Sequence, residues 1–224
     1  MINAQRTRGE SPSEVFPQWR EAQLAVGHLA FEPLVAAPVL RTTGFLGPDL
    51  AELVTDWFLG EPTGSEDALR ESYRALEQET ARLYEIVCGL GVRVHYVRHD
   101  PYGAAAELCA ELRQHRTMSL TTIASDEPHP LLGGEEGGVV DQLRVVHDVL
   151  GHAALGLGFD LQSEFATWLQ CRTLFSAEAR GAAFCELVGA VTTYIATGEK
   201  PGLRGDVPPM ALVAACNVDG CGRS

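Results

Sequence analysis

The chain has 224 residues and a net charge of −13 at pH 7, with 30 acidic and 17 basic side chains. This balance disfavours nucleic-acid backbones and anionic membranes as partners, because no basic excess exists to replace their counterions. No apolar run approaches the ~18 residues of a spanning helix, and no apolar block follows the N-terminal arginines as in a secretory signal. We therefore expect a cytoplasmic protein that acts on a small molecule.

Residues 1–16 are polar and predict a flexible leader. The spacing of apolar residues then predicts helices over 17–32 and 48–59, the second ending at Gly60. Thr63 and Glu66 have the spacing of a capping box and predict the start of the clearest helix, which Gly89 and Gly91 end. Its expected buried stripe consists of Leu69, Tyr73, Leu76, Thr80, Leu83 and Val87.

Two short segments have the pattern of strands. Residues 92–97 (VRVHYV) alternate with a period of two, and residues 118–124 are rich in β-branched side chains. Between them, Asp100 and Pro101 predict a helix start. The Pro- and Gly-rich residues 125–138 indicate a break between lobes or an active-site flap.

From Val139 to about Gly198 the pattern is helical again, followed by a loop over 198–209 and a short apolar segment, MALVAA. We predict a mainly α fold: a single helical metal-binding domain over 17–215 with one or two minor strands. The tail, 216–224, contains Cys216 and Cys221. The other cysteines are isolated in helix-like segments, which argues against a disulfide framework.

The segment VVHDVLGHAAL (145–155) holds two histidines, His147 and His152, within an apolar helical pattern. Five residues correspond to about 140° around an ideal α-helix, so the two rings would diverge on a straight helix. Gly151 could distort the helix and bring both rings to one metal ion. Two later carboxylates in apolar surroundings, Glu164 and Glu186, are candidates for a third ligand.

Two histidines and one carboxylate with open positions form the facial triad of non-haem Fe(II) oxygenases, and a similar set can hold zinc. The competing interpretation is a non-catalytic helical binding protein, in which both histidines are hydrogen-bonded core residues.

The hexapeptide HDVLGH resembles HELLGH of the aromatic amino acid hydroxylases, which are pterin-dependent non-haem iron enzymes. The resemblance covers about forty residues and implies Fe(II) held by His147, His152 and, ahead of Glu164, Glu186. It also implies a monooxygenase that uses dioxygen and a small aromatic or amino-acid-like substrate. The family's Pro-Glu-Pro-Asp lead-in is replaced here by residues 142–146, and the glutamate is six residues nearer, which argues against tetrahydropterin as cofactor.

A second resemblance extends over DPY (100–102), HP (129–130), RVVHDVLGH (144–152) and SEFATW (163–168). This order is similar to a group of poorly characterised bacterial and phage proteins with an R-x-V-H-D-x-x-G-H block. It favours Glu164 as a ligand and leaves open a dinuclear centre that uses both glutamates.

VHDVLGH also resembles the core of HD-type metal-dependent phosphohydrolases, in which the adjacent His and Asp both bind metal. That resemblance implies Asp148 as a ligand, His115 or His129 upstream, and Asp206 downstream. The chain lacks a basic cluster for phosphate, which argues against it.

Further residues are candidates for the catalytic and substrate-binding site. Arg144, one turn before His147, could bind a substrate carboxylate or be solvated, and Asp148 could orient a histidine or ligate metal. His129 and Tyr102 could line the pocket. Trp168 could do so too, or belong to the core. The preferred hypothesis is a non-haem Fe(II) oxygenase.

Overall fold

The computed structural model describes residues 48–121, 128–199, 201–204 and 206–215. The expected leader, the helix predicted over 17–32 and the cysteine-containing tail lie outside these residues. Within them the chain is mainly α with one small sheet, as the sequence predicts. No helix of the described ranges combines the length and the apolar character needed to cross a membrane.

The elements follow in a simple order. A first group comprises α4 (Pro48–Leu59), α5 (Glu66–Gly89), β1 (Arg93–Val97), α6 (Ala105–His115) and β2 (Thr117–Thr121). A second group comprises α7 (Val139–His147), the π-helix η1 (Asp148–Ala153), α8 (Leu161–Cys171), α9 (Ala177–Phe184), the π-helix η2 (Cys185–Gly189), α10 (Ala190–Thr197) and α11 (Met210–Ala215).

Helix α5 confirms the predicted stripe, because all six of its expected core positions are buried. Its start differs from the capping-box prediction. The N-cap is Ser65, whose hydroxyl accepts a hydrogen bond from the Ala68 N–H, whereas the Thr63 N–H donates to Asp206. The helix therefore begins at Glu66, because Thr63 is hydrogen-bonded to the distant Asp206 and does not cap the helix.

Strands β1 and β2 pair in parallel, with Val94 opposite Met118 and Tyr96 opposite Leu120. Helix α6 connects them and begins at Ala105, so the predicted start at Asp100 is wrong. The Asp100 carboxylate accepts a hydrogen bond from the Thr121 hydroxyl, at 3.1 Å, instead of capping a helix. A side chain used by the sheet cannot also satisfy the free N–H groups of a first turn.

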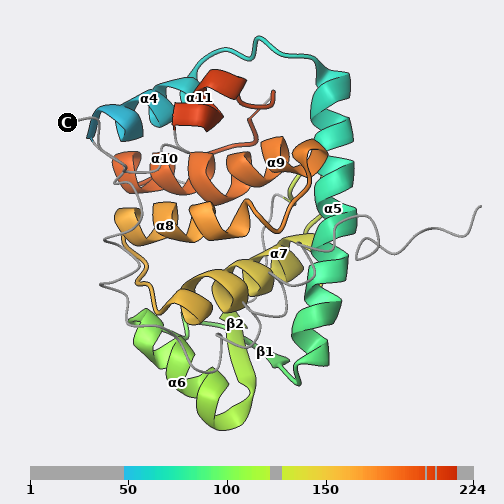
Figure 1. Cartoon of the computed structure of the whole chain (residues 1–224), viewed down its shortest axis with the longest axis vertical. Helices are drawn as coiled ribbons and strands as arrows, with labels where there is room; N and C mark the ends of the chain where they lie inside the picture. Colours follow the sequence, from blue (N-terminus) through green and yellow to red (C-terminus); the bar gives the residue numbers. More distant parts are fainter. Residues whose placement is uncertain (1–47, 122–127, 200, 205, 216–224) are drawn as a thin grey trace, which may run out of the picture.

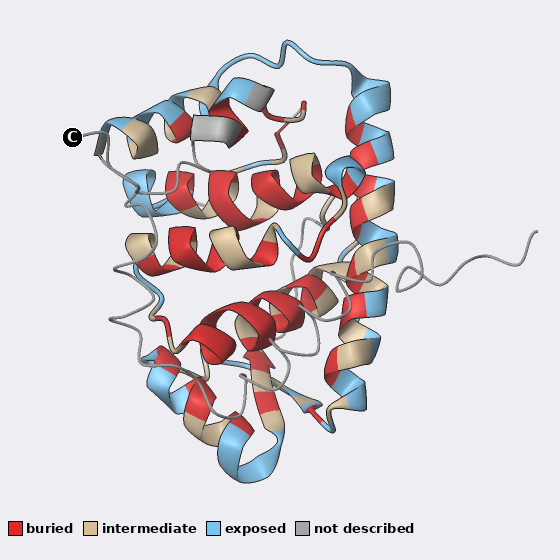
Figure 2. Cartoon of the chain, viewed as in Figure 1, coloured by how far each residue is buried: buried red, intermediate tan, exposed pale blue. Residues whose placement is uncertain are grey.

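The helices stack beside α5 (Figure 1). Helices α7 and η1 form one layer, α8 the next, and the continuous run of α9, η2 and α10 a third, with α5 in contact with both α7 and α9. The sheet and α6 lie at the end next to η1. Figure 2 shows η1 buried over nearly its whole length, whereas α5 alternates between buried and exposed residues. The core therefore surrounds the segment that carries the two histidines.

A buried ion pair closes the opposite end of the molecule. Arg204 donates from Nε to Asp206 at 2.5 Å, and its guanidinium lies 4.9 Å from the centre of the Trp57 ring. Asp206 also accepts hydrogen bonds from the backbone N–H groups of Thr63 and Gly64. The remaining Arg204 donors bind carbonyl groups at the end of α4 and just after it, those of Phe58, Gly60 and Glu61.

Candidate metal centre

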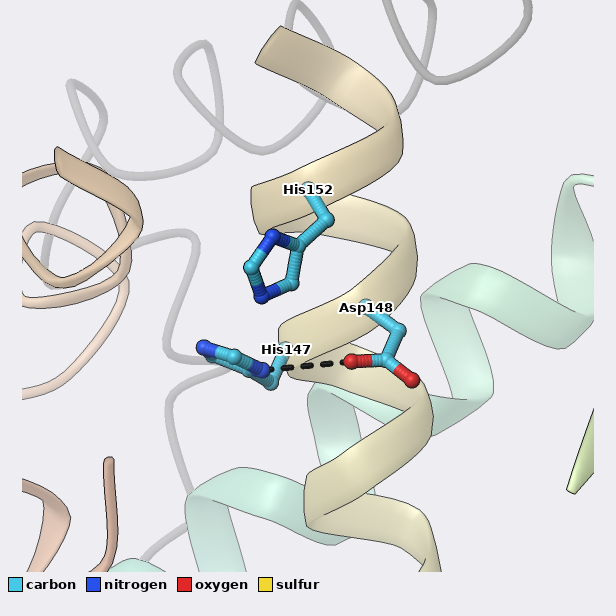
Figure 3. Close-up of side chains that lie close together, drawn as sticks. All are labelled: His147, Asp148 and His152. Carbon is cyan, nitrogen blue, oxygen red and sulfur yellow. Dashed lines mark hydrogen bonds and ion pairs between the residues drawn. The ribbon is translucent and has the colours of Figure 1, made fainter. Parts of the chain in front are cut away.

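The π-helix η1 explains how two histidines five residues apart can meet. In a π-helix the backbone hydrogen bond runs from i to i+5, so residues with that spacing lie one above the other. His147 ends α7 and His152 lies within η1, and their ring centres are 4.7 Å apart with nearly perpendicular planes. Figure 3 shows the two rings side by side along this helix. The divergence of about 140° expected for an α-helix is thus removed.

Helix α8 brings a carboxylate to both rings. Oε2 of Glu164 lies 3.4 Å from Nε2 of His147 and 3.3 Å from Nε2 of His152. Asp160 caps the helix, accepting from the N–H groups of Gln162 and Ser163, and thereby fixes the first turn that carries Glu164. The site is therefore assembled where α7 continues into η1 and where α8 packs against η1.

These contacts lack the geometry of hydrogen bonds. Nε2 of His147, Nε2 of His152 and Oε2 of Glu164 are all buried and have no hydrogen-bond partner within the described part of the chain. Three adjacent polar atoms without partners are costly in a protein interior. A metal ion among them would satisfy all three at once.

The two distances from Glu164 to the histidines agree with shared coordination. Two ligand atoms that each lie about 2.0–2.1 Å from an ion are about 3.3 Å apart in a tetrahedral and about 3.0 Å apart in an octahedral arrangement. The observed 3.3 and 3.4 Å fall near these values. The donor set fits iron and zinc alike.

Asp148 sets the orientation of the first histidine. Its Oδ1 lies 3.2 Å from Nδ1 of His147, on the ring nitrogen that does not face Glu164 (Figure 3). A proton on Nδ1 leaves the Nε2 lone pair free, the usual arrangement of a metal-binding imidazole. Asp148, His147 and His152 also offer ligand atoms within 4.8 Å of one another. We favour Glu164 over Asp148 as the carboxylate ligand, because Asp148 already holds His147.

The carboxylates control the protonation of the buried groups nearby. Burial lowers the pKa of His152, but the Glu164 carboxylate, Asp148 and the Gly158 backbone outweigh it and raise the pKa. Burial, with Glu164 and Asp148, raises the pKa of the Cys171 thiol, which keeps it neutral. Glu164 and Asp148 are therefore the sources of negative charge beside the two histidines.

Glu186, the other candidate ligand, belongs to a different cluster. Its Oε1 accepts a hydrogen bond from the Tyr73 hydroxyl at 2.5 Å and lies 3.2 Å from Nε2 of His129. Burial and the Glu186 charge raise the pKa of Tyr73 far above its usual range, so the phenol stays protonated. No ion pair joins Glu186 to His147 or His152 among the described residues.

The remaining candidates lie as follows. Arg144 donates to the Thr121 carbonyl at 3.0 Å, and the Tyr102 hydroxyl donates to Glu111 and accepts from the Ser119 N–H. Trp168 is fully buried against Phe184, at 5.4 Å between ring centres, and so belongs to the core.

Of the residues considered for an HD-type site, His115 is exposed at the end of α6, and Asp206 is paired with Arg204. Within the described ranges, neither residue forms an ion pair with His147 or Asp148.

Comparison of the chain with protein-family models, with curated proteins and with solved structures finds no match.

Sequence reasoning did not identify Tyr73 as part of a polar cluster, since its position on the α5 stripe is that of an ordinary core residue. It also did not predict either π-helix. The five-residue histidine spacing was the available signal for η1, because it matches the i to i+5 hydrogen-bond spacing of a π-helix.

Proposed function

We propose that His147, His152 and Glu164 bind one Fe(II) ion and that the protein is a non-haem iron oxygenase that oxidises a small molecule. The observation that carries the proposal is that Oε2 of Glu164 lies within 3.4 Å of Nε2 of both histidines, and that all three atoms are buried without a hydrogen-bond partner among the described residues. Two imidazoles and one carboxylate are the donor set of the facial triad.

The three ligands come from neighbouring helical segments. His147 ends α7, His152 lies in η1 and Glu164 lies in α8, so a six-coordinate ion would keep positions that these three ligands do not fill. When bound in such a site, Fe(II) supplies open positions for dioxygen and the electrons for its reduction. The His147 and Glu164 side chains keep 10% and 12% of their surface exposed and His152 has none, so a small molecule would approach the ion from the side of His147 and Glu164. The class of substrate, aromatic or amino-acid-like, rests on the hydroxylase resemblance alone.

The HD-type alternative is less well supported by the same geometry. It needs a further histidine and a downstream aspartate at the metal, and both Asp206 and His129 have other partners. It also needs Asp148 as a ligand, whereas Asp148 lies against Nδ1 of His147.

Metal analysis tests the proposal. Protein purified without a histidine tag and loaded anaerobically with Fe(II) is expected to hold one iron per chain. Glu164→Gln and His152→Ala should each lose it, whereas Glu178→Gln, a change at an exposed glutamate of α9, should keep it. Iron-dependent dioxygen consumption would then be screened with aromatic amino acids. Full iron occupancy in Glu164→Gln would contradict the assignment.

A further inference from the structure

A second polar cluster lies outside the proposed metal centre. Tyr73 of α5, His129 of the segment before α7 and Glu186 of η2 come from three separate parts of the chain and meet at one carboxylate oxygen. The centres of the Tyr73 and His129 rings lie 5.4 Å apart, and their planes are tilted by 33°. Glu186 stands in the second π-helix, and π-helical turns are frequent at functional sites.

The backbone fixes the tautomer of His129. Its Nδ1 accepts hydrogen bonds from the N–H groups of Leu131 and Leu132, at 3.2 and 2.9 Å, in a tight turn closed by the His129–Gly133 bridge. An accepting Nδ1 carries no proton, so the proton of the neutral ring is on Nε2 and points to Glu186. His129 is therefore a donor in this cluster and offers no lone pair to a metal.

The cluster therefore has a net negative charge. Two neutral donors, Tyr73 and His129, hold Oε1 of Glu186, and no lysine or arginine of the described residues forms an ion pair with this carboxylate. No hydrogen bond of the described residues reaches the other oxygen, Oε2, and Oε2 is not one of their buried polar atoms that lack a partner. With 23% of its side chain exposed, this oriented carboxylate is partly accessible, and its hydrogen-bond partners among the described residues are the neutral Tyr73 and His129.

We propose that the Tyr73–His129–Glu186 cluster binds the ammonium group of a small organic amine through Oε2 of Glu186. A single positive charge with several N–H donors matches a single carboxylate oxygen. A divalent metal fits less well, because Tyr73 and His129 both present protons and only Glu186 could ligate. The proposal does not depend on iron binding at His147, His152 and Glu164.

Binding of simple amines to the full chain tests this. The probes are benzylammonium and n-butylammonium, with benzyl alcohol and n-butanol as neutral analogues, and dissociation constants are measured by ligand-observed NMR. The measurements are made with and without EDTA, since a neutral amine could also bind a metal. Wild-type protein should bind the ammonium ions and discriminate against the alcohols by about 10–100-fold, the value of a hydrogen bond to a charged group.

Glu186→Gln should bind the ammonium ions more weakly by the same factor of about 10–100 and should keep its iron content. Glu178→Gln should change neither ammonium binding nor iron content. Tyr73→Phe retains the carboxylate and should still prefer ammonium, which preserves the test if Glu186→Gln fails to fold. Equal binding of amines and alcohols by wild type would overturn the proposal. So would loss of iron in Glu186→Gln, which would make Glu186 a metal ligand. Absence of iron in wild type would instead count against the proposed function only.

Discussion

Gly151 of η1 lies directly against Thr167 of α8, so that a Cβ placed on Gly151 would overlap with the Thr167 methyl group, Cγ2. The same Cβ would come within 3.3 Å of Sγ of Cys171. Thr167 and Cys171 follow Glu164 at spacings of three and seven, on the face of α8 that meets η1. The absence of a side chain at Gly151 therefore sets the close approach that brings Glu164 to both histidines.

Gly151→Ala is expected to push η1 and α8 apart. We expect a loss of about 1–3 kcal/mol in the free energy of unfolding, the usual cost of overpacking, together with weaker iron binding. Urea unfolding and metal titration measure the two effects. Adding Thr167→Ser removes the overlapping methyl group and should restore part of both.

Gly89→Ala is the matched control, because a Cβ at Gly89, at the end of α5, has nothing within 4 Å. It should leave iron binding unchanged. Wild-type iron affinity in Gly151→Ala would show that the helix contact does not position Glu164.

Asp148→Asn distinguishes an orienting residue from a ligand. An asparagine can no longer hold the His147 ring as a carboxylate does, but it leaves the three proposed ligands in place. We expect iron still to bind, with an affinity about 10–100-fold lower. Titration of the metal-free variant with Fe(II) measures this change in affinity. Complete loss of metal, as in Glu164→Gln, would favour the HD-type ligand set instead.

Asp160 links the start of α8 to the metal centre. Burial raises its pKa, but hydrogen bonds from Ser163 and the Gln162 N–H outweigh this and lower it, so the cap is a carboxylate. Asp160→Ala should cost about 1 kcal/mol of stability and weaken iron binding, because Glu164 lies in the first turn. Ser65→Ala removes the α5 cap at a similar cost and should leave iron binding intact. Equal effects of both variants on iron would argue against a local role for Asp160.

Local patterns predict most of the fold. The stripe from Leu69 to Val87 is a regular α-helical repeat, and each of its positions packs as the repeat requires. The end of α10 at Gly198, with φ of 74°, is equally local, because glycine readily takes that conformation. The starts of α5 and α6 differ from the predicted ones because the predicted cap residues bind distant partners. Thr63 binds Asp206, and Asp100 binds Thr121.

The candidate site was less accessible to sequence reasoning. The histidine pair was evident, but an α-helical template places the rings apart, and the change to π-helical geometry is needed to bring them together. Glu164 and Glu186 both stand in apolar segments, so composition does not separate them. The difference is tertiary: Glu164 faces η1, whereas Glu186 faces Tyr73 and His129.

The Arg204–Asp206 pair should contribute stability that depends on pH. Burial raises the pKa of Asp206, but hydrogen bonds from the Thr63 N–H, Arg204 and the Gly64 N–H outweigh it, so the folded pKa lies below the ordinary value. A lowered folded pKa means that the stabilisation is complete above the unfolded pKa and is lost as pH falls through the folded one. Asp206→Asn should therefore destabilise by about 3–5 kcal/mol at neutral pH, because it leaves Arg204 buried without its counter-charge.

Urea unfolding from pH 7 down to strongly acidic pH measures the difference in the free energy of unfolding between wild type and Asp206→Asn. It should shrink only below about pH 4, the ordinary range of an aspartate. The exposed Glu66–Arg70 pair of α5 provides the control, since its loss in Glu66→Gln should cost less than about 1 kcal/mol. A difference between wild type and Asp206→Asn that stays constant through the acid range would show that the charge of Asp206 is not the source of its contribution.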